Sequence, residues 1–275
     1  MHKAEQWLLD EKHAGRKTAE FEAGLKRLAA GEPLAYVIGW QPFLGLKIYL
    51  DSKPLIPRPE TEWWTEQLMQ TLKGGDNFAG RESHSATARG EAIFQQKNMP
   101  LSSSEVSAPM RVLDLCAGSG AIGCAILKYA PNAHVYFGEI DSAHQSTIRT
   151  NIRENRLDES RAHIGIGDLF EPFGDTRFDV IACNPPYIPA SRALDKSVAD
   201  YEPALALRAG EDGLELLRRL AAELPHRLNP GGWAWIECDS AHAAAACALF
   251  TAQGFSAVVR TDQYHVPRLI VVSYP

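Results

Sequence analysis

The sequence has few of the features that mark secreted, metal-binding or membrane-spanning proteins. It contains five cysteines in 275 residues, an odd number, and no two of them form a C-x-x-C pair. We therefore expect neither a disulfide framework nor a metal site. No apolar run reaches the length of a membrane helix, and no stretch at the start resembles a signal peptide. These absences predict a cytoplasmic protein with reduced thiols and no membrane contact.

The chain also lacks the positive charge that sequence-blind binding to nucleic acid requires. Lysine and arginine number 28 against 34 acidic residues, which gives a net charge of −6. We therefore expect no direct nucleic-acid partner, although a local basic patch is compatible with these totals. Hydrophobic residues make up 45% of the sequence. That content is enough for the core of one α/β domain with a smaller appendage.

The N-terminal part divides into two predicted regions. The first, residues 1–33, is a short helical segment, because its apolar residues recur at helical spacing. The second, residues 34–73, is a β-hairpin with a connecting helix. Within it, residues 34–50 alternate as strands do, and Gln41-Pro42 predicts the hairpin turn. A helix is expected over 60–73.

The remaining sequence predicts a linker and one large α/β domain. Residues 74–109 are dominated by small and polar residues, which indicates a flexible insertion or linker. Residues 110–275 alternate between strand and helix patterns, which predicts a doubly wound, mostly parallel seven-stranded sheet of the Rossmann-like type. The last two strands should pair as a hairpin, which places one antiparallel strand in the sheet. Strands are expected at 111–115, 133–139, 162–166, 178–183, 232–238, 255–260 and 268–273, and helices at 120–130, 142–155, 211–227 and 240–252.

The first chemical motif is a glycine turn after the strand at 111–115. The turn reads Cys116-Ala117-Gly118-Ser119-Gly120 and leads into a helix. Such a turn lets backbone N–H groups approach a ligand, and the helix N-terminus faces the same crevice. A simple tight turn between strand and helix is the alternative. Because Gly123 falls inside the predicted helix, we read the spacing as G-x-G, which disfavours a nicotinamide-dependent dehydrogenase.

Three carboxylates lie at or near the ends of successive predicted strands. Asp114 precedes the glycine turn, where a carboxylate suits a cationic amino-acid ligand better than a pyrophosphate. Glu139 can accept both hydroxyls of a ribose, with Asp141 as the neighbouring candidate. Asp168, with Leu169 beside it, fits adenine binding. Each acid alone could be a solvated strand end or a turn residue, but together they indicate one ligand crevice.

The second chemical motif, Asn184-Pro185-Pro186-Tyr187, follows the strand at 178–183. The two prolines fix the backbone and remove two N–H donors, which leaves nearby carbonyls free to accept. An NH2 group needs two acceptors to be held flat, and the Asn184 side-chain oxygen and the Pro185 carbonyl can supply them. Tyr187 offers a ring face to a planar group. A loop stiffened by prolines is the alternative, but we expect these four residues to be the catalytic ones.

With this motif in place, the chain resembles class I methyltransferases that act on planar nitrogens. It resembles more closely the release factor glutamine methyltransferase family. The closer likeness rests on Gly-Glu-Pro at 31–33, on Ile-Pro-Arg-Pro-Glu-Thr-Glu at 56–62 and on Tyr-Glu-Pro-Ala-Leu at 201–205. It covers residues 31–73 and 110–275. At 236–239 the chain departs from the family's glutamate-and-glycine pattern, and nothing in the sequence explains the change.

The resemblance implies transfer of a methyl group from S-adenosylmethionine to the glutamine of the Gly-Gly-Gln motif in peptide chain release factors. A release factor would be the protein partner, and a monomer is expected. The implied cofactor contacts are Cys116 to Gly120, Glu139, Leu169 and Asn184, while Asn184 to Tyr187 would hold the glutamine. Arg58, Glu60 and Thr61 would lie near the active site and help to close it.

Two other functions would use parts of the same pattern. An adenine-amine methyltransferase on DNA or RNA would use the same chemistry after base flipping. The acidic charge and the lack of a basic recognition domain speak against it. The other alternative is an S-adenosylmethionine-binding protein that does not catalyse. The complete motif at 184–187 speaks against this one, because such a protein has no need of two aligned acceptors.

Overall fold

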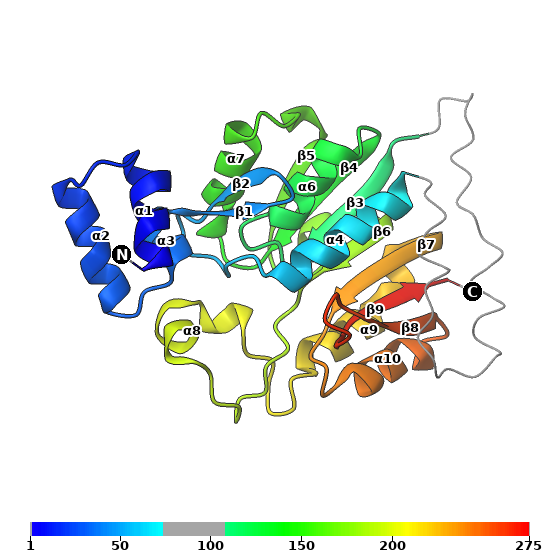
Figure 1. The fold of residues 1–275 in the computed structure, drawn as a ribbon. Coiled ribbons are helices and arrows are strands. Elements are labelled where there is room, and N and C mark those ends of the chain that lie inside the picture. The colour runs from blue at the N-terminus through cyan, green and yellow to red at the C-terminus, as the bar shows by residue number, and fades with distance from the viewer. Residues whose placement is uncertain (1, 74–107, 275) are drawn as a thin grey trace.

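The computed structural model describes residues 2–73 and 108–274 and shows a seven-stranded sheet with helices on both faces (Figure 1). The strand order is β5-β4-β3-β6-β7-β9-β8, and β9 runs antiparallel to both β7 and β8. This confirms the predicted doubly wound, mostly parallel sheet. The strands are β3 (Met110–Leu115), β4 (Ala133–Glu139), β5 (Ala162–Ile166), β6 (Phe178–Cys183), β7 (Leu228–Glu237), β8 (Ser256–Thr261) and β9 (Pro267–Ser273).

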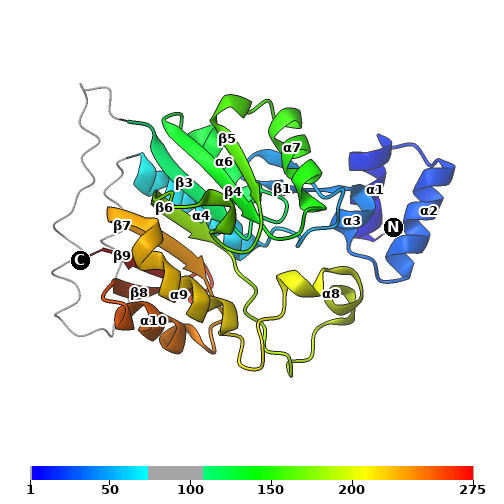
Figure 2. The same ribbon diagram turned by 180° about the vertical axis from the view of Figure 1, so that it is seen from behind.

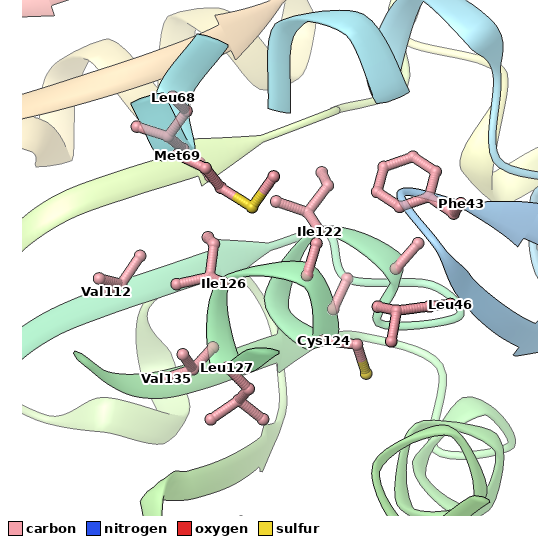
Figure 3. Packing of buried hydrophobic residues seen from close by; sticks show 14 of the residues in the cluster. Phe43, Leu46, Leu68, Met69, Val112, Ile122, Cys124, Ile126, Leu127 and Val135 are labelled. Atoms are coloured by element: carbon pink, nitrogen blue, oxygen red, sulfur yellow. The ribbon is translucent and has the colours of Figure 1, made fainter. Parts of the chain in front are cut away.

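Alternate residues of each strand face opposite sides of the sheet and build two cores. Val112 belongs to the core under one helical layer, while the next residue, Leu113, belongs to the core under the other. The first layer holds α4 (Pro59–Leu72), α6 (Ala121–Tyr129) and α7 (His144–Glu154), and the second holds α9 (Glu215–Arg227) and α10 (Ala243–Ala252). Figure 2 shows the second layer from behind. In Figure 3, Met69 of α4 points toward Ile122 of α6.

The stretch at 34–38 is a short helix, α3 (Leu34–Ile38), so the predicted strand there is wrong. The alternation rests on Tyr36 and Ile38. Their neighbours Ala35 and Val37 are apolar as well, and all four side chains are buried. The segment therefore has no alternation of apolar and polar residues, which is the pattern that would indicate a strand. It ends at Gly39, whose φ of 102° favours glycine.

The hairpin turn also lies elsewhere than predicted. Strands β1 (Trp40–Phe43) and β2 (Leu46–Tyr49) are joined at Leu44-Gly45, and Gln41-Pro42 lies inside β1. Both turn residues have positive φ, 47° and 68°, as a tight two-residue hairpin requires. A proline is tolerated inside β1 because a two-stranded sheet leaves one side of each strand unpaired.

The N-terminal helices α1 (Lys3–His13) and α2 (Ala19–Ala29) pack with α3 around their own small core, which includes Leu8 and Phe21. The hairpin joins this segment to the sheet domain, because Tyr49 N–H donates to the Asn151 side chain of α7 over 2.6 Å. Helix α8 (Lys196–Tyr201), which no periodicity indicated, follows the motif at 184–187.

Two further predictions concern the linker and the membrane. The predicted linker at 74–109 lies outside the described residues except for its last two positions. Within 2–73 and 108–274, no helix combines the length and the apolar character needed to cross a membrane.

Candidate active site

A cavity opens at the carboxyl ends of the central strands, beside the point where the strand order reverses between β3 and β6. Its empty space is about 1070 Å³, counted with the open mouth. Open α/β sheets bind ligands at this position. Of the residues predicted from sequence, those that line the cavity are Cys116, Gly118, Glu139, Asp141, Asp168, Leu169, Asn184 and Pro186.

Asp114, in the strand before the glycine turn, is bonded to the first turn of α6, the helix that follows it. The Gly123 N–H donates to the Asp114 carboxylate over 2.8 Å, and this side chain is fully buried and does not line the cavity. Burial raises the pKa of Asp114 well above its usual range. Ala117, Ser119 and Gly120 also lie outside the cavity lining. The turn itself needs positive φ at residues 116, 118 and 120.

Glu139 at the end of β4 has a fixed carboxylate. One oxygen accepts from the Gly118 N–H over 2.7 Å, and the other accepts from the Asp141 N–H over 2.9 Å. Each oxygen keeps a second lone pair, since a carboxylate accepts about four hydrogen bonds. Two oxygens oriented in this way at the cavity wall can receive a pair of neighbouring hydroxyls.

Asp168 stands at the rim of the same cavity. Its carboxylate accepts from Arg219 of α9 over 2.7 Å, and both side chains remain partly exposed. Leu169 beside it is buried and takes a positive φ of 46°. Two exposed apolar side chains, Ile140 and Leu205, add apolar surface to the lining.

Asn184 lies at the junction of two cavities. It lines the cavity just described and also a second one, which Pro185, Tyr187 and Arg58 line as well. Pro186 faces the first cavity. The Asn184 side-chain N–H donates to the Thr61 hydroxyl of α4 over 3.1 Å. A group held from the second cavity and a ligand in the first would therefore meet at Asn184.

Sequence reasoning missed Glu237, the last residue of β7. Its carboxylate is buried and accepts from Thr61 over 2.7 Å, from Trp64 over 2.8 Å and from Tyr187 over 3.0 Å. Burial raises its pKa, although the three donors act in the opposite direction. The available signal was an acid at the tip of the strand that follows the 184–187 motif in the sheet.

The three residues predicted to close the site have different surroundings. Arg58 lines the second cavity and forms an ion pair of 2.6 Å with the buried Glu202. Thr61 contacts Asn184 directly. Glu60 lines neither of these two cavities. The Arg58–Glu202 pair ties the segment before α4 to the loop after the motif.

The departure at 236–239 now has a physical account. Asp239 is buried and forms an ion pair with Arg192, which lies in the loop after the motif. The Ala241 N–H also donates to Asp239 over 2.8 Å. This aspartate therefore fastens the loop to the end of β7.

Comparison with known proteins identifies related sequences and folds. Residues 97–201 match the family model described as the methyltransferase small domain. The release factor glutamine methyltransferase of Geobacter sulfurreducens is 34% identical over 233 residues, which are 83% of this chain and 68% of that protein. The one from Xylella fastidiosa (strain Temecula1) is 34% identical over 89% of this chain and 77% of its own length.

Another relative carries a different name. The ribosomal protein uL3 glutamine methyltransferase of Bradyrhizobium diazoefficiens is 33% identical over 75% of this chain, but the match covers only 57% of that protein. Among solved structures, the hMettl16 catalytic domain bound to an RNA hairpin has a TM-score of 0.55 at 15% identity, over 84% of this chain and 76% of that one. At this identity the likeness shows the fold alone.

Proposed function

Because this chain belongs to the release factor glutamine methyltransferase family, we propose that it methylates a peptide chain release factor. The methyl group would come from S-adenosylmethionine, and the acceptor would be the side-chain amide nitrogen of the glutamine in the Gly-Gly-Gln motif. The observation that carries the proposal is the place of Asn184, which borders two cavities and is tethered by its nitrogen to Thr61.

The residues of the first cavity fit S-adenosylmethionine. Glu139 presents two fixed carboxylate oxygens to the hydroxyls of a ribose. Leu169 and Ile140 supply apolar surface for an adenine, and Asp168 lies beside them at the rim. Of the turn at 116–120, Cys116 and Gly118 line the cavity and would lie beside the amino-acid part. Asp114 would act on this part indirectly, by fixing the start of α6 through the Gly123 N–H.

The second cavity would receive the glutamine side chain. The tether to Thr61 leaves the Asn184 side-chain oxygen free to accept from the substrate NH2 group. The Pro185 carbonyl is the second acceptor we infer, and the Tyr187 ring would lie against the flat amide. The N-terminal helical segment stands on the same side as α8, where Tyr201 donates to the Ala30 carbonyl over 3.0 Å. We infer that this segment helps to bind the protein substrate.

The chemistry follows from holding a weak nucleophile in line with its target. S-adenosylmethionine, when bound, supplies an electrophilic methyl group on a positively charged sulfur. An amide nitrogen attacks poorly because its lone pair is delocalised. Two acceptors on its N–H groups fix its plane and bias the lone pair toward the first cavity. Alignment of this kind supplies a large share of catalysis, and the proton can leave after the methyl group has been transferred.

A panel of acceptors tests the proposal. The chain is incubated with methyl-labelled S-adenosylmethionine and, separately, with a bacterial release factor, ribosomal protein uL3 or duplex DNA. We expect label on the release factor alone, and no label on a release factor whose Gly-Gly-Gln glutamine is replaced by alanine. Label on uL3 alone would assign the chain to the activity named for its Bradyrhizobium relative. Label on DNA alone would assign it to adenine methylation.

A further inference from the structure

We propose that Glu237 is a positioning residue whose two carboxylate oxygens fix the orientation of Asn184 and Tyr187 toward the acceptor amide. The inference rests on the proposed function and deepens it. Glu237 ends β7, and the neighbouring pair Cys183 and Ile236 brings this end of β7 beside the start of the 184–187 motif. Its side chain is 1% exposed. Three donors from two different parts of the chain converge on it.

The first oxygen, Oε2, sets the direction of a chain of hydrogen bonds. It accepts from Trp64 Nε1 and from the Thr61 hydroxyl, and an indole nitrogen can only donate. The Thr61 hydroxyl has one proton, and it is used toward Glu237. Toward Asn184, 3.1 Å away, Thr61 can therefore only accept.

This direction determines which atom of Asn184 faces the substrate. Were the carboxamide reversed, its oxygen would meet the Thr61 oxygen with no proton between them. The nitrogen of Asn184 must therefore face Thr61, and its oxygen must face away from Thr61. Glu237 thereby selects the carboxamide orientation that presents an acceptor to the substrate NH2 group.

The second oxygen, Oε1, accepts from the Tyr187 hydroxyl over 3.0 Å. Burial and the Glu237 charge raise the pKa of this hydroxyl, so it keeps its proton and remains the donor. The bond fixes the far end of the ring that would lie against the amide. One carboxylate therefore orients two parts of the glutamine site, and a glutamine at position 237 could not, since it offers one acceptor oxygen in place of two.

The test compares variants of one helix and one strand tip. Thr61→Val removes the hydroxyl at nearly constant shape, and Thr61→Ser restores it. Thr65→Val is the matched control, because Thr65 is equally buried one turn further along α4 and donates only to the Thr61 backbone carbonyl over 2.7 Å. Glu237→Gln replaces one of the two carboxylate oxygens by an NH2 group, so either Tyr187 or the pair Thr61 and Trp64 loses its acceptor. Methyl transfer by the wild-type chain to the release factor is measured first. A failure of the proposed function is therefore distinguished from a failure of the inference about Glu237.

We expect Thr61→Val to lower kcat on the order of tenfold to a hundredfold, the scale of a small misalignment, and Glu237→Gln to lower it about tenfold. The dissociation constant for S-adenosylmethionine should change less than about threefold, because neither residue lines the first cavity. Thr61→Ser and Thr65→Val should retain kcat. Wild-type kcat in either Thr61→Val or Glu237→Gln would overturn the inference, as would an equal loss in Thr65→Val.

A second measurement does not depend on methyl transfer. It therefore still tests the inference if a variant folds poorly or if the release factor is not modified. The Asn184 side-chain NH2 signals in a ¹⁵N–¹H spectrum are assigned by their disappearance in Asn184→Asp. In the wild-type protein we expect slow hydrogen exchange at the proton bonded to Thr61, and in Thr61→Val we expect fast exchange. Fast exchange in the wild-type protein would contradict the tether.

Discussion

In the proposed site, Asn184 and Glu139 would act through the orientation of single atoms. Glu139 is held by two backbone N–H groups, and Asn184 is held by one hydroxyl. Sequence alone placed both residues at strand ends, because an apolar run that stops at a polar residue marks the edge of a sheet. It did not indicate which atoms face the cavity, since Thr61, to which the Asn184 side chain donates, lies more than 100 positions away.

Asn184→Ala should separate the two cavities' roles. It removes the side-chain acceptor for the substrate NH2 group but leaves the carboxylate of Glu139 in place. We expect kcat to fall about a hundredfold or more, the scale seen when one preorganised polar contact is lost. Binding of S-adenosylmethionine, measured by calorimetry, should weaken by less than about tenfold.

A variant with wild-type turnover would remove Asn184 from the catalytic role. A complete loss of cofactor binding would instead show that Asn184 serves mainly the first cavity. As a control for both measurements, the Asn184→Ala variant must keep the helix content and the thermal midpoint of the wild-type chain.

Asp114 should make stability depend on pH. Burial raises its folded-state pKa above the unfolded value, so the folded state binds the proton more tightly. The free energy of unfolding therefore falls as the pH rises through this window and is greatest below the unfolded pKa, near 4. Asp114→Asn removes the buried charge and should flatten this decline.

Urea unfolding of both proteins between pH 4 and pH 9 measures the effect. We expect the free energy of unfolding of Asp114→Asn to rise relative to wild type with increasing pH, by about 1 kcal/mol or more at the upper end. Two parallel pH curves would contradict the raised pKa.

At the scale of elements, the central strands were predictable and the connections were not. Strands β4, β5 and β6 begin and end where the apolar runs predicted. Helix α4 was also predicted within one residue at each end, but its packing over α6 was not, because no local pattern says which face of a sheet a preceding helix covers. Thr61 and Trp64 reach Glu237 only through that packing.

The contact between α6 and β4 depends on glycine. A Cβ atom on Gly123 would lie 2.2 Å from the Phe137 ring, which is fully buried and cannot withdraw. We expect Gly123→Ala to lower the free energy of unfolding by about 1–3 kcal/mol, as overpacking does.

Gly24→Ala in α2 is the comparison. Its Cβ would lie 2.8 Å from a terminal methyl group of Leu8, a less severe approach than the 2.2 Å at Phe137, and alanine is favoured in a helix by about 1 kcal/mol. Its cost should therefore be smaller than that of Gly123→Ala. Chemical unfolding measures both, and an equal or greater cost for Gly24→Ala would contradict the account.

For the whole molecule, the two cavities share Leu55, Asn184 and Ala206, and Asn184 follows β6 at the topological switch point. The order of strands in a doubly wound sheet brings the ends of β3 and β6 together, so the glycine turn and the 184–187 motif had to be neighbours. The second cavity could not be predicted, because α8 and the loop that form it have no periodic pattern. The acidic net charge of −6 agrees with a protein substrate better than with nucleic acid.

The position of the transferred methyl group tests the central claim most directly. A bacterial release factor is incubated with the chain and S-adenosylmethionine, digested, and mapped by tandem mass spectrometry. The account predicts one added methyl group, on the side-chain amide of the Gly-Gly-Gln glutamine, and none when Asn184→Ala replaces the wild-type chain. A release factor that stays unmodified, or that carries its methyl group on another residue, would contradict it.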